Sequence, residues 1–64
     1  MLVLTQRPNK SLVIELAEGV ESTLTLKDLF ANGPIEITLL GIEKRQFKMG
    51  IIAPPELSIR RKYE

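Results

Sequence analysis

Residues 35–52 read IEITLLGIEKRQFKMGII, and this stretch decides the fold. Apolar side chains alternate with polar ones along residues 35–42 and again along residues 46–52. A repeat of two residues is typical of β-strands, because successive side chains point to opposite faces of a sheet. Three polar residues, Glu43-Lys44-Arg45, separate the two segments, so the stretch predicts a β-hairpin.

Three further segments have the composition of strands. Residues 1–6 and 11–16 are rich in β-favouring side chains, and the turn-forming Arg7-Pro8-Asn9-Lys10 between them predicts a second hairpin. Ala53-Pro54-Pro55 then holds the backbone extended and outside a hydrogen-bonded ladder. Residues 56–61 alternate once more, so the sequence predicts five strands in all.

One segment breaks the strand pattern and predicts a short helix at about residues 26–32. Thr25 is suited to cap its N-terminus, with Asp28 close to the spacing of a capping box. Asn32-Gly33-Pro34 is typical of a helix end, because glycine adopts the left-handed cap and proline cannot continue the helix. Residues 20–24 fit either an extension of the preceding strand or a lead into the helix.

Together these elements predict a mainly β fold with one short α-helix, in the order ββαβββ. We interpret residues 1–64 as a single domain with a helical insertion at about residues 17–34. One helix face carries Leu26, Leu29 and Phe30, and this spacing favours packing in a core over docking of a partner. One short helix cannot cover both faces of such a sheet, whereas a second copy of the sheet could.

The composition argues against catalysis and leaves few ways to stabilise so short a chain. There is no histidine and no cysteine among the 64 residues. The commonest general base, the best nucleophile, disulfides and the ordinary zinc and haem ligands are therefore missing. We expect no enzyme activity, no catalytic residues, no metal or other cofactor and no small-molecule substrate. Oligomerisation is the remaining stabiliser, so we expect a homodimer.

The hydropathy of the chain bears on its location. No apolar run approaches the length of a membrane span. The first residues, Met-Leu-Val-Leu, are not the basic leader of a secretory signal. We therefore expect a cytoplasmic protein that has no membrane partner.

The charge is separated along the sequence, although the net charge is only +1. Residues 1–10 carry two cations and no acid, residues 11–43 carry six acids and one lysine, and residues 44–64 carry six cations and two acids. A local basic patch attracts polyanions whatever the total charge. On composition alone, solvated terminal charge is the favoured interpretation, because only Phe30, Phe47 and Tyr63 could stack on bases.

Both ends of the chain resemble the carbon storage regulator family (CsrA/RsmA). Residues 1–7, MLVLTQR, are similar to the opening strand of that family. Leu40-Gly41-Ile42, the run QFKMGI that begins at Gln46, and the following Ala-Pro are similar to its third and fourth strands and the next loop. Residues 57–61, LSIRR, are similar to its fifth strand. The resemblance covers roughly residues 1–16 and 35–61.

Two departures from the family pattern have one explanation. The family joins its second and third strands by a tight turn, where this chain has residues 17–34. The family carries a helix after its fifth strand, where this chain has only three residues after Arg61. A helix moved into the insertion accounts for both, and this resembles the divergent RsmN/RsmF branch of the family.

The resemblance implies an interleaved homodimer in which the first strand of one chain lies beside the fifth strand of the other. It also implies a site for GGA motifs, with Arg61 as its most important side chain. Gln6 stands where the family usually has arginine, so one charge is missing there. The RNA-binding positions implied are Leu4, Thr5, Gln6, Arg7, Ala53, Pro54, Leu57, Ser58, Ile59, Arg60 and Arg61.

The function implied is post-transcriptional regulation. Such a protein binds GGA motifs in messenger RNA leader hairpins, blocks translation, and is titrated by small regulatory RNAs. The alternative from another class is an interlocked β-dimer that binds DNA or protein, such as an antitoxin-like or transition-state regulator module. A purely structural subunit is a third interpretation, which predicts no nucleic-acid binding at all.

Overall fold

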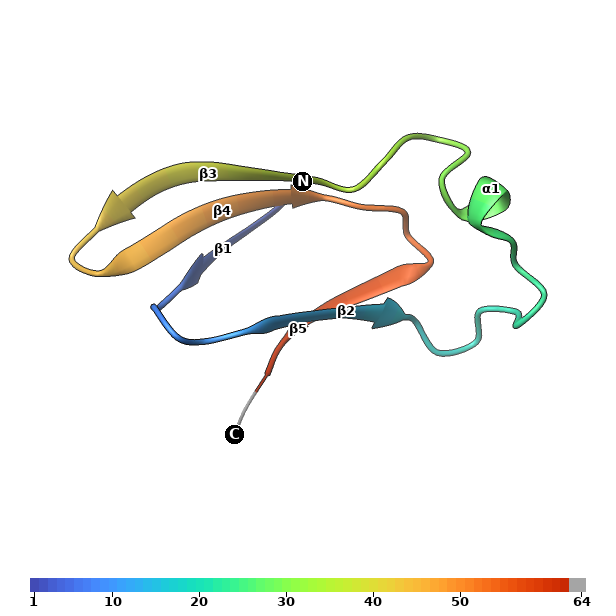
Figure 1. Ribbon diagram of the computed structural model, residues 1–64, viewed down its shortest axis with the longest axis horizontal. Helices are drawn as coiled ribbons and strands as arrows, with labels where there is room; N and C mark the ends of the chain where they lie inside the picture. The colour runs from blue at the N-terminus through green and yellow to red at the C-terminus, as the bar shows by residue number, and fades with distance from the viewer. Residues whose placement is uncertain (63–64) are drawn as a thin grey trace.

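The computed structural model describes residues 1–62 (Figure 1), and Tyr63 lies outside the described residues. Five strands and one helix follow in the predicted order ββαβββ, so the predicted fold class is confirmed. Each strand matches its predicted range to within one residue at either end. The elements are β1 (Leu2–Gln6), β2 (Leu12–Leu16), α1 (Leu26–Leu29), β3 (Glu36–Glu43), β4 (Gln46–Ile52) and β5 (Leu57–Arg61).

The strands form two separate antiparallel sheets, one of order β1-β4-β3 and one in which β2 pairs with β5 (Figure 1). The predicted hairpin of the first two strands is therefore wrong. A turn does form, because the Lys10 N–H donates to the Arg7 carbonyl at 3.3 Å and Asn9 takes a φ of 65°. The chain leaves that turn for the other sheet, since β1 pairs along all five of its residues with β4.

The predicted hairpin of β3 and β4 is present. Glu43 lies opposite Gln46, which leaves a two-residue turn, and both of its residues have positive φ: 48° at Lys44 and 63° at Arg45. Two successive positive φ values define the type I′ turn, whose twist matches that of the strands it joins. The register shifts between Leu39 and Gly41, where a β-bulge interrupts the alternation that the sequence predicts.

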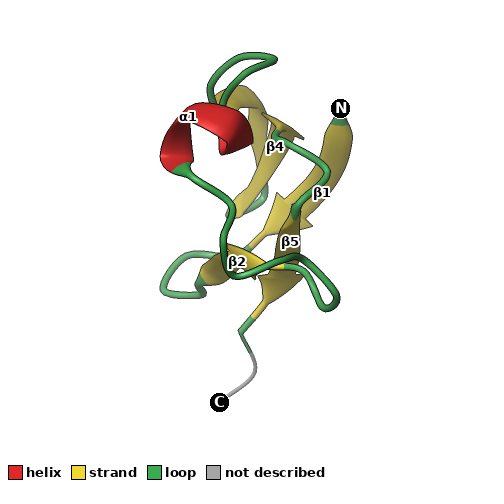
Figure 2. Cartoon of the chain, turned by 90° about the vertical axis from the view of Figure 1, so that its right-hand side faces the viewer, coloured by secondary structure: helices red, strands yellow, loops and turns green. Residues whose placement is uncertain are grey.

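Helix α1 is shorter than predicted. The predicted cap is present, because the Thr25 hydroxyl accepts from the Asp28 N–H at 3.1 Å. The helix ends at Leu29, and the next residues form turns up to Gly33, whose φ is 123°. Figure 1 shows α1 beyond the ends of the strands, Figure 2 shows it from that side, and Leu26 is 74% exposed. Of the face that was predicted to pack in a core, Leu26 and Phe30 are exposed in the single chain, whereas Leu29 is half-buried.

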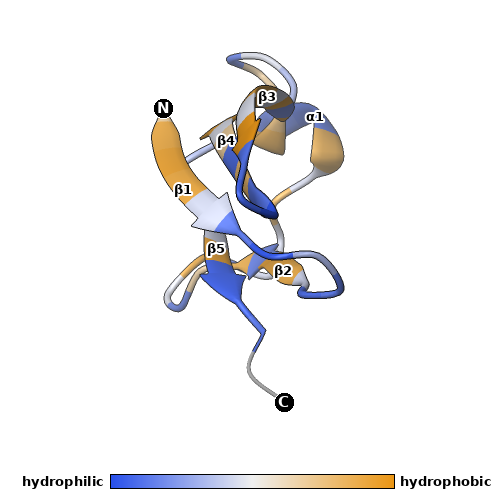
Figure 3. Ribbon diagram, turned by 90° about the vertical axis from the view of Figure 1, so that its left-hand side faces the viewer, coloured by the Kyte–Doolittle hydropathy of each residue, from blue (hydrophilic) through white to orange (hydrophobic). Residues whose placement is uncertain are grey.

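The single chain has almost no core. Of the residues described, Ile51 is the one buried large apolar side chain, at 2% exposure. The radius of gyration is 13.5 Å, whereas a compact domain of this length has about 11 Å. Apolar side chains stay exposed on both flanks of the β1-β4-β3 sheet, including Val3, Ile37 and Ile42. Figure 3 shows the apolar colouring of β1 ending at a hydrophilic turn.

Over the part of the chain that the structure describes, α1 is the sole helix and no helix is long and apolar enough to cross a bilayer.

Candidate nucleic-acid interface

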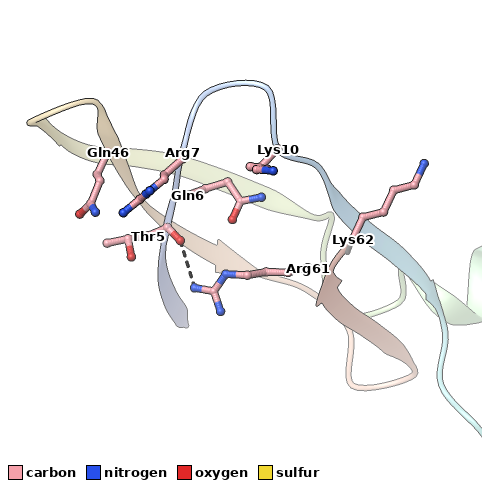
Figure 4. Close-up of a pocket in the computed structure, with 7 residues that line it drawn as sticks. All are labelled: Thr5, Gln6, Arg7, Lys10, Gln46, Arg61 and Lys62. Carbon is pink, nitrogen blue, oxygen red and sulfur yellow. Dashed lines mark hydrogen bonds between the residues drawn. The ribbon is translucent and has the colours of Figure 1, made fainter. Parts of the chain in front are cut away.

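The last residue of β5 contacts the first strand. The Arg61 guanidinium donates from Nη2 to the Thr5 carbonyl oxygen at 3.0 Å (Figure 4). β1 is an edge strand of its sheet, because β4 is its one strand neighbour in the described chain. A side chain from one sheet therefore binds the backbone edge of the other, although the two residues are far apart in the sequence.

A hollow of about 330 Å³ surrounds this contact. Three strands and one turn bring its residues together: the end of β1, the turn after it, the start of β4 and the end of β5. Among residues 1–62, four cations and no carboxylate line it. Figure 4 shows Arg61 pointing toward Thr5 and Lys62 pointing away from it. The lining residues are Thr5, Gln6, Arg7, Lys10, Gln46, Arg61 and Lys62.

Gln6 is held inside the structure and is only 8% exposed. Its side-chain Nε2 donates to the Ser11 carbonyl at 3.2 Å, across the turn that joins β1 to β2. An unpaired buried amide would be costly. This hydrogen bond gives Gln6 a structural role at the turn, in addition to its place in the lining of the hollow.

Arg60 is engaged elsewhere. Its Nε lies 2.8 Å from a carboxylate oxygen of Glu15, on the paired strand β2. Both side chains are about half exposed, so the ion pair contributes less than about 1 kcal/mol to the stability of the fold. An anionic ligand would have to compete with this carboxylate for Arg60.

The structure brings together only some of the predicted site residues. Thr5, Gln6, Arg7 and Arg61 line the hollow described above. Leu4 and Ile59, with Arg60 and Arg61, line a neighbouring hollow between β1 and β5.

The remaining predicted residues lie elsewhere in the single chain. Ala53 and Pro54 line a third hollow, beside Leu29 of α1. Leu57 and Ser58 begin β5, and Leu57 lies about 13 Å along the strand from Arg61 at 3.3 Å per residue.

Three residues of the hollow were not among the predicted site residues. Lys10 and Lys62 belong to the basic ends of the sequence, so their charge was a usable signal. Gln46 carried no such signal. It reaches the hollow because β4 pairs with β1, with Phe47 opposite Gln6.

The fold and this surface define a small, mainly β protein with a cation-lined hollow between a strand edge and a strand end. Comparison with protein families then identifies the class: the model of the CsrA global regulator protein family matches residues 1–63. The chain belongs to this family of RNA-binding post-transcriptional regulators, which is not a family of enzymes and whose members act as homodimers. Neither the search of curated proteins nor the search of solved structures gave a match.

Proposed function

We propose that the protein binds GGA motifs in the loops of messenger RNA leader hairpins and thereby blocks translation. Small regulatory RNAs with the same motif would compete for it. The observation that carries the proposal is the contact of Arg61 with the Thr5 carbonyl inside a hollow lined by cations. Bases in an RNA loop are unstacked, so a strand edge can read them while arginine binds the phosphates.

Binding with three probes tests this function. A hairpin with GGA in its loop should bind, while the same hairpin with the GGA changed and a DNA duplex of equal length should bind much more weakly. Equal binding of all three would contradict recognition of GGA. Preference for the DNA duplex would support the alternative DNA-binding module, and binding of none would contradict a nucleic-acid function.

We also propose that residues 1–64 form a single domain and that the protein works as a homodimer of two such chains. Within residues 1–62, β1 and β5 each have one edge without a strand neighbour. Exposed strand edges and exposed apolar faces favour pairing with a second chain. Sedimentation should give about twice the chain mass, and the melting temperature should rise with protein concentration. A folded monomer at micromolar concentration would contradict the dimer.

The dimer raises the question of which chain supplies Arg61. In the single chain, the same chain's Arg61 contacts Thr5. An interleaved dimer would place the partner's Arg61 there instead.

A mixed dimer of one Arg7→Ala chain and one Arg61→Ala chain separates the two arrangements. If each site takes both residues from one chain, both sites are weakened. If each site takes one residue from each chain, one site in every mixed dimer keeps both arginines and binds the GGA hairpin with the parent's affinity.

A further inference from the structure

We propose that the tips of two turns form a second RNA-binding surface, which holds the sugar–phosphate backbone of the stem below the GGA loop. The turns are residues 7–10, between β1 and β2, and residues 44–45, between β3 and β4. The proposal rests on the proposed function, because it assigns the second surface to the same RNA that the Thr5–Arg61 hollow binds.

The two turns meet in the folded chain. Together they line a hollow of about 460 Å³, distinct from the one around Arg61. Its residues come from both turns and from the first position of β4. They are Arg7, Pro8, Asn9, Lys10, Lys44, Arg45 and Gln46.

The charged side chains that line this surface are all positive. Four of its seven lining residues are cations, and within residues 1–62 no carboxylate lines it. The nearest acid in the sequence, Glu43, lines a different hollow with Lys48. Clustered cations without acids attract a polyanion even when the net charge of the protein is close to zero.

The two cations of the second turn occupy a backbone conformation that favours other residues. Lys44 and Arg45 have φ values of 48° and 63°. These values lie in the left-handed region, which residues other than glycine and asparagine rarely adopt. The type I′ turn favours Asn-Gly at these positions. Turn geometry therefore gives no reason for a lysine and an arginine here, whereas binding of an anion does.

The surface continues from the Thr5–Arg61 hollow. Arg7, Lys10 and Gln46 line both hollows, so one basic track runs from the end of β5 to the tip of the β3–β4 turn. An RNA with its loop at Arg61 can therefore lay the adjoining nucleotides along the turns.

The chemistry of the hollow at the two turns favours a stem over a further length of single strand. No aromatic side chain lines this hollow in the described chain. Proteins that bind unpaired nucleotides without reading their sequence stack the bases on aromatic rings, whereas contacts to a duplex backbone need only cations and hydrogen-bond donors.

A double variant tests the proposal without harming the turn. Lys44→Asn with Arg45→Gly removes both cations and installs the pair that the type I′ turn prefers, so the fold should be kept. Three RNA probes share one GGA-containing sequence: an unpaired oligonucleotide, a hairpin with a short stem and a hairpin with a long stem, each hairpin with the sequence in its loop. Lys27→Asn, a charge change on α1, is the matched control, and circular dichroism checks that each variant is folded.

We expect the parent to bind the long-stem hairpin more tightly than the short-stem one, by about ten-fold at low salt. The double variant should lose that gain and bind the unpaired oligonucleotide within about two-fold of the parent. Its log–log salt slope on the long-stem hairpin should be less steep by roughly 1.8, for two lost phosphate contacts. Lys27→Asn should match the parent on every probe.

Other results would overturn the second surface. Parent-like binding of the long-stem hairpin by the double variant would overturn it and leave the proposed function standing, and so would an equal loss on all three probes. If the parent binds an added DNA duplex more tightly than the long-stem hairpin and the double variant loses that binding, the turns bind DNA and the proposed stem surface is wrong. If the parent binds none of the GGA probes, the proposed function itself fails.

Discussion

Two regions of the molecule that lie apart along its long axis differ in charge and in structure (Figure 1). One region, here called the basic end, holds the residues that line the two cation-rich hollows at the turns and at the end of β5. The other, the helix end, holds α1 and the segments 17–25 and 30–35, and carries Glu18, Glu21 and Asp28 with only Lys27 against them.

This difference teaches where each kind of change should act. The cations of the basic end are largely exposed and pack little, so changes to them should affect RNA binding and leave stability almost intact; the buried Gln6 side chain is the exception. The helix end contributes caps and turns without a cation cluster, so changes there should affect stability and leave binding intact. A net charge of +1 conceals this separation.

The largest effect is expected from Arg61→Ala. Because a charge-assisted contact is worth roughly 1–3 kcal/mol, the variant should bind a GGA hairpin about ten-fold or more weakly. Its melting temperature should change little, since the side chain is exposed. A hairpin titration beside a thermal melt measures both quantities, with Lys27→Ala as the control. A folded Arg61→Ala protein that binds like the parent would show that the basic end does not hold the site.

Gln6→Arg, also in the basic end, should strengthen RNA binding while it lowers the stability of the fold. The new cation should tighten binding at low salt and steepen the log–log salt slope by roughly 0.7 for one added single-strand phosphate contact. The same change removes the hydrogen bond to the Ser11 carbonyl, which costs about 1 kcal/mol of stability.

Titrations at two salt concentrations and a urea melt give the two numbers for Gln6→Arg. Gln6→Ala is its control, because it should lose the stability without gaining affinity. Unchanged stability in both variants would contradict the structural role of the Gln6 amide.

Thr25→Ala is the corresponding change at the helix end. It removes the hydroxyl that accepts from the Asp28 N–H, and a lost N-cap costs about 0.5–2 kcal/mol. The lower half of that range is expected, because α1 is a single exposed turn. GGA-hairpin binding should stay within about two-fold of the parent. Thr25→Ser, which keeps the cap, should restore the stability in a urea melt.

The smallest effect is expected from Glu15→Gln, in the sheet between the two ends. The exposed pair with Arg60 contributes less than about 1 kcal/mol, so the urea midpoint should hardly move. Arg60 is then released toward RNA, and hairpin binding should tighten by a few-fold at low salt. Weaker binding of Glu15→Gln would show that the carboxylate positions Arg60 for RNA instead of competing with it.

Much of this protein was readable from local sequence patterns. Alternating side chains located all five strands, and the Thr25 cap and Gly33 located the helix, because backbone conformation responds to neighbouring residues. The charge separation pointed to the basic ends. The Lys44-Arg45 turn was also expected, although its left-handed geometry was not.

Only the tertiary structure decided which strands pair and which residues meet. The segment at residues 7–10 has the sequence of a hairpin turn, yet β1 joins β4 and β2 joins β5. The pairing of β1 with β4 places Gln46 and Arg7 in the lining of the same hollows and brings the two turns together. A turn sequence specifies a local reversal of the chain, whereas strand pairing depends on distant backbone partners and on apolar surface that the pairing buries. That information is spread over the whole chain, so no single segment contains it.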